Sequence, residues 1–185
     1  MGDLLARDLC TSALDRVRHL HIGSWFLHVG AVADLPDLLA EARRRGVAGA
    51  TGWSRDGSLH DAARHLLRQL APDGAVVLKC GAEGAYVHTG TSVLHVKAPA
   101  VDVIDTVGAG DSLAAGFLHA RLRGAGLDEA LRLAVAAGTL STRRSGGVDA
   151  QPTPDEAEQL VRQLVCTTET RTRQPSSDRP VEGTP

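Results

Sequence analysis

Asparagine is absent from this chain, and aromatic residues are scarce. Only two tryptophans, two phenylalanines and one tyrosine occur among the 185 residues. A core of ordinary size must therefore be built mainly from leucine, valine and alanine. Cysteine is also rare, and Cys10, Cys80 and Cys166 are odd in number and widely separated. This spacing excludes a disulfide framework and a cysteine-based metal site, and it favours a reducing, cytoplasmic location.

Long apolar runs and an excess of either charge are absent too. No apolar stretch approaches the ~20 residues that a membrane-spanning helix needs, and no signal-peptide pattern is present. The formal net charge is −2, so nothing favours nucleic acid as a partner. Lysine occurs only at Lys79 and Lys97, and arginine supplies the other basic residues. We expect a globular protein that binds neither membrane nor nucleic acid.

Hydrophobic periodicity predicts that helices alternate with strands. The apolar run Ala75–Cys80 is typical of a strand buried on both faces of a parallel sheet. Helices are expected over 1–17, 34–45, 58–70, 112–123, 128–143 and 153–165, and strands over 19–23, 75–80, 85–88 and 92–96, the last two as a hairpin. This pattern predicts an α/β layered domain over 1–166 with a mostly parallel central sheet. The polar residues 167–185 are predicted to be a disordered tail.

The stretch Asp105-Thr106-Val107-Gly108-Ala109-Gly110-Asp111 leads into the helix predicted from Ser112. Glycines that open a helix leave backbone N–H groups pointing outward, and such an N-terminus attracts anions. Asp111 would lie within reach of a bound anion and could take a proton from an attacking hydroxyl. The same residues would equally serve as an ordinary turn with an aspartate cap, so both interpretations stand at this point.

Two further stretches contain closely spaced small residues. In Lys79-Cys80-Gly81-Ala82-Glu83-Gly84-Ala85, the glycines allow the backbone to approach a ligand closely. Lys79 could face phosphates there, although a lysine that ends a strand is usually only solvated. In Ala136–Gly147, small residues would make room for a flat base. The alternative for that helix is close packing on the sheet through alanine and glycine.

Together these stretches resemble the signatures of the ribokinase-like (PfkB) carbohydrate kinases. Asp105–Asp111 is similar to the family's D-T-x-G-A-G-D, and Lys79–Ala85 is similar to its v-K-x-G-x-x-G turn. Ala136–Gly147, followed by Gln151-Pro152-Thr153, is similar to the family's C-terminal ending. The resemblance covers roughly 18–165 and implies a Rossmann-like, ribokinase-like fold. It also implies ATP-dependent phosphoryl transfer to a hydroxyl of a sugar or nucleoside substrate, with Mg²⁺ bridging the phosphates.

The resemblance implies roles for individual residues as well. The catalytic set consists of Asp111 as general base and the N–H groups of the anion hole, Gly108, Ala109 and Gly110. The residues that border ATP are Lys79, Gly81, Gly84, Ala137 and Gly138. The ligands of a potassium ion are Asp105 and the carbonyl groups of Val107, Ser141, Arg144 and Gly146.

The sequence departs from the family in two places. The family's N-x-x-E motif, which arranges Mg²⁺ and the phosphates, is impossible in a chain without asparagine, and residues 46–57 join two helices that strands separate in relatives. The upstream part with the sugar-binding loop and lid has no counterpart either. We therefore expect an incomplete domain whose exposed sheet edges favour self-association, with a homodimer as the simplest form.

Three hypotheses about function follow from these departures. The first is a kinase that acts despite the losses, or with another chain that supplies the missing parts. The second is a non-catalytic module of the same fold that binds nucleotide or a partner. The third is a truncated product without a stable function.

Overall fold

The computed structural model describes residues 74–170 and seven earlier ones, Glu41, Arg44, His60, Ala63, Arg64, Leu67 and Arg68. All of the earlier ones except Arg68 are helical, in agreement with the helices expected over 34–45 and 58–70. The helix expected over 1–17, the strand expected over 19–23 and the segment 46–57 lie outside the described residues.

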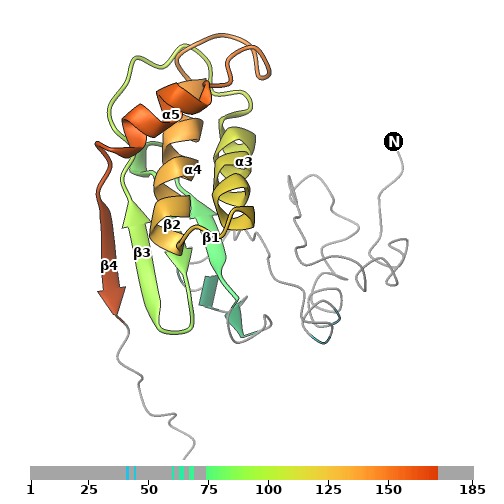
Figure 1. Cartoon of the computed structure of the whole chain (residues 1–185), viewed down its shortest axis with the longest axis vertical. Helices are drawn as coiled ribbons and strands as arrows, with labels where there is room; N and C mark the ends of the chain where they lie inside the picture. Colours follow the sequence, from blue (N-terminus) through green and yellow to red (C-terminus); the bar gives the residue numbers. More distant parts are fainter. Residues whose placement is uncertain are drawn as a thin grey trace, which may run out of the picture.

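Four strands form the sheet of the described part (Figure 1). They are β1 (Val76–Lys79), β2 (Ala85–His88), β3 (Ser92–Val96) and β4 (Cys166–Thr170), and they lie side by side in that order. The expected hairpin over 85–88 and 92–96 is confirmed at both bounds.

Every pairing between the described strands is antiparallel, so the expectation of a mostly parallel sheet is wrong for this part. For the pairs β1–β2 and β2–β3, the reason is the length of the connections. β1 and β2 are joined by the short 3₁₀ turn η5 (Gly81–Glu83), and β2 and β3 are joined by residues 89–91. Parallel neighbours would need a crossover of a dozen residues or more.

Helical residues pack against both faces of the sheet, which agrees with the expected α/β layering. Helices α3 (Ala109–Leu122), α4 (Leu127–Ser141) and α5 (Pro154–Val161) lie together over one face (Figure 1). Side chains alternate between the two faces of a strand, so Val87 and Val96 enter the core beneath α4 with Leu131. On the other face, Val76 and Leu78 of β1 form a second cluster with Ala63. At β1, the sheet is therefore covered on both faces.

The sequence signals at α5 are confirmed at its start but not at its end. Thr153 and Glu156 form a reciprocal capping box, and Pro154 occupies the first turn, where its missing N–H costs nothing. The helix was expected to continue to Val165, but it ends at Val161. Two hydrogen-bonded turns of the backbone follow it. The chain then extends into β4.

Strand β4 was not predicted. Thr167, Thr168, Glu169 and Thr170 pair with β3, so the expected boundary between domain and tail at 166/167 falls inside a strand. The residues after Thr170 lie outside the described part. Four of the five residues in β4 are exposed, and this leaves little apolar alternation by which the strand could be read.

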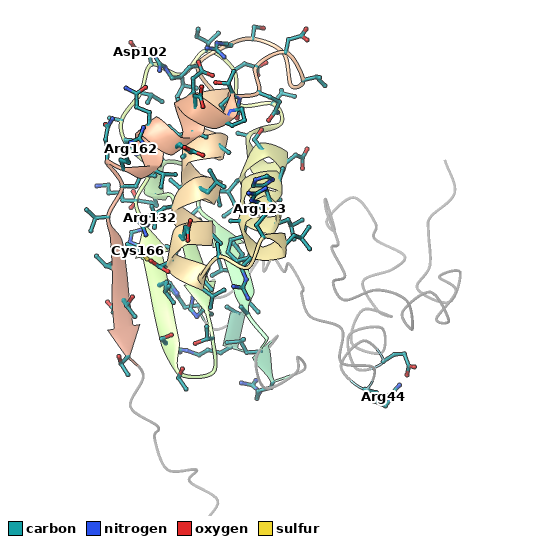
Figure 2. The ribbon with its side chains drawn as sticks, viewed as in Figure 1. Arg44, Asp102, Arg123, Arg132, Arg162 and Cys166 are labelled. Atoms are coloured by element: carbon teal, nitrogen blue, oxygen red, sulfur yellow. The ribbon has the colours of Figure 1, made fainter. Side chains whose placement is uncertain are left out.

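Side chains of α4 reach across to the start of β4. Arg132 of α4 lies near Cys166 (Figure 2), and its Nη2 donates to Asp128 Oδ2 at 3.0 Å. Burial raises the pKa of the Cys166 thiol. Cys80 and Cys166 are both free thiols. Within the described part, no helix has the length and apolar character of a membrane span.

Candidate functional site

The chain enters α3 through a glycine in the left-handed conformation. Gly108 has φ of 79° and stands at the N-cap without a side-chain cap. A Cβ added to it would lie 3.3 Å from Gly147 Cα. Its carbonyl accepts the N–H groups of Asp111 at 3.0 Å and Ser112 at 2.9 Å. The first turn of α3 is therefore closed by the backbone, and no side chain caps it.

The three N–H groups of the expected anion hole are not equivalent. The N–H of Ala109 donates to the carbonyl of Thr106 at 3.2 Å. Those of Gly108 and Gly110 make no hydrogen bond among the described residues. Two of the three groups are therefore available to a ligand in front of α3, and the third is used in the turn.

Asp111 is the third residue of α3. Its side chain is exposed, and its carboxylate makes no hydrogen bond within the described part. It does not line the cavity described next, but its neighbour Gly110 does. Asp111 therefore directly follows a cavity-lining residue whose N–H group is free within the described part.

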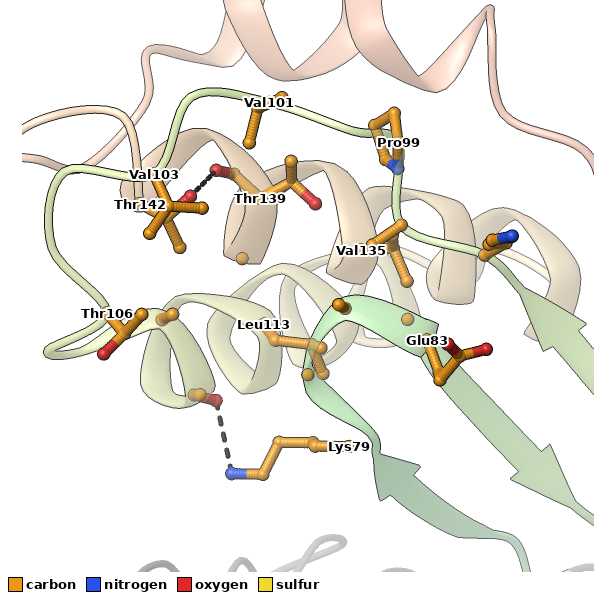
Figure 3. A pocket seen from close by; sticks show the side chains of 18 of the residues that line it. Lys79, Glu83, Pro99, Val101, Val103, Thr106, Leu113, Val135, Thr139 and Thr142 are labelled. Atoms are coloured by element: carbon orange, nitrogen blue, oxygen red, sulfur yellow. Dashed lines mark hydrogen bonds between the residues drawn. The ribbon is translucent and has the colours of Figure 1, made fainter.

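A cavity of about 680 Å³ opens between four parts of the chain (Figure 3). They are η5, the segment that follows β3, the start of α3 and the inner side of α4. Its size is within the range of small-molecule sites. The lining is mostly apolar, and its larger apolar side chains are Pro99, Val101, Val103, Leu113 and Val135. The charged residues in the lining are Lys79, Glu83 and Lys97. Such a cavity suits a flat, partly apolar ligand that carries a charged end.

Most residues expected to border ATP do meet at this cavity. Lys79, Gly81, Gly84 and Gly138 line it, and Ala137 does not. Of the expected anion hole, Ala109 and Gly110 line it and Gly108 does not. The structure thus brings the turn after β1, the start of α3 and the end of α4 to one place.

The turn after β1 is fixed against the end of β3. Gly84 has φ of 85°, and a Cβ added to it would lie 2.0 Å from Val96 O and 2.7 Å from Ala98 N. No other residue fits there. The carbonyl of Gly84 also accepts the N–H of Cys80 at 2.8 Å. The backbone of η5 is therefore held as one wall of the cavity.

Lys79 joins this wall to α3. It is the last residue of β1, and its Nζ donates to the carbonyl of Gly110 at 3.3 Å (Figure 3). A Cβ added to Gly110 would lie 3.2 Å from the same nitrogen. The ammonium group consequently lies in the space that the missing side chain leaves open.

The two small residues of α4 have different surroundings. A Cβ added to Gly138 would lie 3.1 Å from Ala109 O and Leu113 Cβ of α3, and Gly138 also lines the cavity. The Cβ of Ala137 lies against Gly116 of α3. The close packing expected between this helix and the sheet is therefore packing between α4 and α3. At Gly138, the same small residue serves both the packing and the cavity wall.

Asp105 connects the two loops next to α3. Its Oδ1 accepts the N–H of Val107 at 2.9 Å, and its Oδ2 accepts the N–H of Gly146 at 3.2 Å. These hydrogen bonds, first that of Val107 and then that of Gly146, lower the pKa of the Asp105 carboxyl. The backbone N–H groups of Ile104 and Asp105 donate to Thr142 O at 2.8 and 3.2 Å. The loop before α3 is thus attached to the end of α4.

Hydrogen bonds join three of the residues expected to bind potassium. Asp105, Val107 and Gly146 are joined by the hydrogen bonds just described, and the carbonyl of Gly146 also accepts the N–H of Ala150 at 2.9 Å. Ser141 is buried in the last turn of α4, where its hydroxyl donates to Gly138 O at 2.9 Å. The side chain of Arg144 turns to Glu156 of α5, at 2.6 Å. In the described part, no group of three His, Cys, Asp or Glu side chains could hold a metal ion.

Several lining residues were not predicted as site residues. Lys97 and five residues of the run that follows it, all except Asp102, come directly after β3, and Thr139 and Thr142 stand at the end of α4. The run has no periodicity because it belongs to neither helix nor strand, so its apolar side chains look like a loop in the sequence. The one available signal was Lys97, which is one of only two lysines in the chain.

Comparison with known proteins gives the same assignment at several levels. Residues 46–154 match the family model described as pfkB family carbohydrate kinase. The aminoimidazole riboside kinase of Salmonella typhimurium is 32% identical over 178 residues, which cover 84% of this chain and 54% of that protein. The ATP-dependent ribose-1-phosphate kinase of Halopiger xanaduensis is 42% identical over 83 residues, which cover 45% of this chain and 28% of that protein.

A solved structure extends the similarity to three dimensions. The crystal structure of aminoimidazole riboside kinase from Salmonella enterica, in complex with aminoimidazole riboside and an ATP analog, superposes with a TM-score of 0.68 at 25% identity. The superposition covers 84% of this chain and 58% of that one. The chain thus spans about half the length of these riboside kinases.

Proposed function

The chain belongs to the pfkB family of carbohydrate kinases, and from that premise we propose that it transfers the terminal phosphoryl group of ATP to a hydroxyl of a sugar or riboside. One observation carries the proposal. A largely apolar cavity ends at the start of α3, where Lys79 and the free N–H group of Gly110 lie together. This arrangement offers a base-binding part and a phosphate-binding end within one cavity.

In this proposal, ATP lies along the cavity. Its adenine would contact Val101, Val103 and Val135, with Gly138 leaving room for the flat ring. Its phosphates would point to the start of α3, where the N–H groups of Gly108 and Gly110 would meet them. Gly81 and Gly84 would let the turn after β1 approach the nucleotide without side chains.

Transfer requires a base for the acceptor hydroxyl. Asp111 would take the hydroxyl proton on its carboxylate as the hydroxyl oxygen forms a bond to the γ-phosphorus. The bond between the γ-phosphorus and the β–γ bridging oxygen breaks, and ADP leaves with that oxygen. The free N–H groups in front of α3 stabilise the charge that develops on the phosphoryl oxygens.

Two cations fit the donor atoms that are present. Mg²⁺ is usually held by phosphates and water with few protein ligands, so the absence of an acidic cluster from the described residues does not disagree with it. When bound, it would neutralise phosphate charge. Potassium would be held by hard oxygen ligands, namely the Asp105 carboxylate and the carbonyl groups of Val107, Ser141, Arg144 and Gly146.

The acceptor would be a polyhydroxylated compound. The relatives include kinases named for aminoimidazole riboside, for 5-dehydro-2-deoxygluconate and for ribose 1-phosphate. These compounds share several hydroxyl groups on a small carbon skeleton. We propose an acceptor of this class and expect Asp111 to act on one primary or secondary hydroxyl.

The test combines a thermal unfolding scan with a turnover screen. We expect Mg-ATP to raise the unfolding midpoint, because a ligand that binds only the folded state stabilises it by mass action. We expect turnover with at least one sugar or riboside. Stabilisation without turnover on any acceptor would instead indicate a nucleotide-binding module, and a chain with neither would refute the proposal.

The variant Asp111→Asn tests the assigned base. We expect it to keep the ATP-dependent shift in midpoint and to lose roughly 10²- to 10⁴-fold in kcat, which is the usual contribution of a positioned base. Asp155→Asn is the matched control, since Asp155 is also an exposed aspartate in the first turn of a helix, α5. Turnover by Asp111→Asn at the level of the control would remove Asp111 from the mechanism.

A further inference from the structure

The segment 145–153 connects α4 to α5, and the carboxylate of Glu156 is bonded at both of its ends. We call this segment the connecting loop. Glu156 Oε1 accepts from Nη2 of Arg144, the residue directly before the loop, at 2.6 Å. Glu156 Oε2 accepts the N–H of Thr153, the last residue of the loop, at 2.8 Å and the hydroxyl of Thr153 at 3.1 Å. One side chain of α5 therefore closes the loop from outside.

Glu156 is held in place by the packing of its helix. Its neighbour Ala157 is buried, and Leu160 and Val161 of the same helix pack against the core. The side chain of Arg144 is exposed, and its guanidinium group makes no other hydrogen bond within the described part. The ion pair is thus the contact that determines where the Arg144 side chain lies.

The connecting loop is also held together by its own hydrogen bonds. The N–H of Ala150 donates to Gly146 O at 2.9 Å, and the side-chain amide of Gln151 donates to Gly147 O at 2.7 Å. The backbone N–H of Gln151 donates to Val148 O at 3.2 Å. These contacts join the first half of the loop to the second, so we expect the loop to move as a unit.

The first half of the loop lies against the residues that lead into α3. The N–H of Gly146 donates to Asp105 Oδ2 at 3.2 Å. A Cβ added to Gly108 would lie 3.3 Å from Gly147 Cα, so the two backbones are in close contact. The carbonyl of Gly108 in turn accepts the N–H of Asp111 at 3.0 Å. The loop thus supports a residue that has a free N–H group and is bonded to the assigned base.

We propose that Glu156 and Arg144 form a latch that positions the start of α3 for phosphoryl transfer. The inference rests on the proposed function, and it makes both of them positioning residues, because neither lines the cavity assigned to ATP. The latch holds the connecting loop against Asp105 and Gly108, and this keeps the free N–H groups and the Asp111 carboxylate in place. A shift of about 1 Å at a reacting group can lower a rate by about 10²-fold.

The test separates kcat from the KM for ATP. Both are measured with Mg-ATP and three acceptors, aminoimidazole riboside, 5-dehydro-2-deoxygluconate and ribose 1-phosphate, for which the relatives are named. We expect Arg144→Met and Glu156→Gln each to lose about tenfold or more in kcat. The KM for ATP should change by less than about threefold, because the latch makes no contact with the cavity. The double variant should lose no more than the more affected single variant, since both substitutions remove the same contact.

Two control variants change the same residue types nearby. Arg143 and Glu158 are exposed, and neither side chain makes a hydrogen bond within the described part. Arg143→Met and Glu158→Gln should therefore keep kcat within about twofold of the wild type. Arg144→Lys, which keeps the cation, should recover part of the loss. All variants should keep the unfolding midpoint within about 4 °C, because an exposed ion pair contributes little to stability and glutamine can still cap α5.

A second measurement follows the path of the effect through the chain. Amide hydrogen exchange, read by peptide mass spectrometry, reports on 104–111 and on 145–153 separately. We expect Arg144→Met and Glu156→Gln to exchange faster than the controls over both ranges and equally over the hairpin of β2 and β3. A latch that only stabilised the start of α5 would speed exchange at 153–157 alone.

The outcomes separate the two claims. A wild-type chain without turnover on any of the acceptors overturns the proposed function and this inference with it. A wild-type chain with turnover, together with latch variants whose kcat equals that of the controls, overturns this inference alone. Loss of kcat in the latch variants with unchanged exchange over 104–111 also overturns it, because the effect would then not reach the start of α3 through the loop.

Discussion

Replacing Gly116 with alanine tests the contact that positions α3 against α4. Gly116 is buried in the middle of α3. A Cβ added to it would lie 2.9 Å from Leu133 O, 3.1 Å from Ala137 Cβ and 3.2 Å from Ala134 Cα. Ordinary contacts are about 3.5–4.0 Å. Two of the three neighbours are backbone atoms, so the strain can be relieved only by moving the helices apart.

The expected magnitude is the difference between two effects. Overpacking a well-packed core costs about 1–3 kcal/mol, and a clash with backbone belongs in the upper part of that range. Alanine recovers about 1 kcal/mol relative to glycine in a helix interior. We expect a net loss of about 1–2 kcal/mol in the free energy of unfolding, or roughly 2–8 °C in Tm for a chain of this size. Separating the helices would also shift the cavity wall at Leu113.

The assay is urea unfolding followed by circular dichroism, with two controls. Gly90→Ala places its Cβ where no atom lies within 4 Å, and it should change stability by no more than about 0.5 kcal/mol. Ala115→Gly, at an exposed position of α3, should lose about 1 kcal/mol through helix propensity alone. If Gly116→Ala instead stabilises the chain by about that amount, the helices are not in close contact, and our account of the α3–α4 packing is refuted.

Two other changes should affect stability in distinct ways. Leu131→Ala removes a fully buried side chain of α4, and we expect a loss of about 2–5 kcal/mol in the free energy of unfolding by urea titration; a loss below about 1 kcal/mol would contradict the assigned core. Glu156→Gln tests a carboxyl whose pKa is lowered to about 2, mainly by the hydrogen bond from Arg144 and then by Thr153. A lowered folded pKa stabilises above the ordinary value near 4.5, and the effect is lost as the pH falls toward 2. The urea midpoints of wild type and Glu156→Gln should therefore differ above pH 5 and converge toward pH 2, and a constant difference would contradict the assignment.

Local signals in the sequence predicted local structure well. The hairpin over 85–88 and 92–96 was predicted to the residue because both strands and their turn lie within twelve residues of one another. The capping box of Thr153 and Glu156 marked the start of α5 in the same way. In both cases, the interactions that form the element are made by residues close in sequence.

Features that depend on distant partners were not predictable in the same way. Strand β4 looks like a polar loop in the sequence because most of its side chains are exposed. It is a strand because it pairs with β3, which lies far earlier in the chain. The direction of the sheet was misjudged from the buried run Ala75–Cys80. A strand covered on both faces reads the same whether its neighbour is parallel or antiparallel.

In the candidate site too, local features were predictable and features that depend on distant residues were not. The glycines at the start of α3 and after β1 were found from their spacing, because backbone approach requires them there. Two hydrogen bonds depend instead on how the loops fold back, which residue spacing does not specify. One runs from Lys79 Nζ to the carbonyl of Gly110, and the other from the N–H of Ala109 to the carbonyl of Thr106.

The pairing of β3 with β4 also has a consequence for folding. Val96 lies opposite Cys166, so this pairing closes a loop that contains all of 97–165. That loop holds α3, α4 and α5 and most of the cavity lining. Closing it has an entropic cost that rises with loop length, whereas the pairs of β1, β2 and β3 close over a few residues. The hairpin can therefore form early, whereas the pairing of β4 with β3 has the larger entropic cost and forms later.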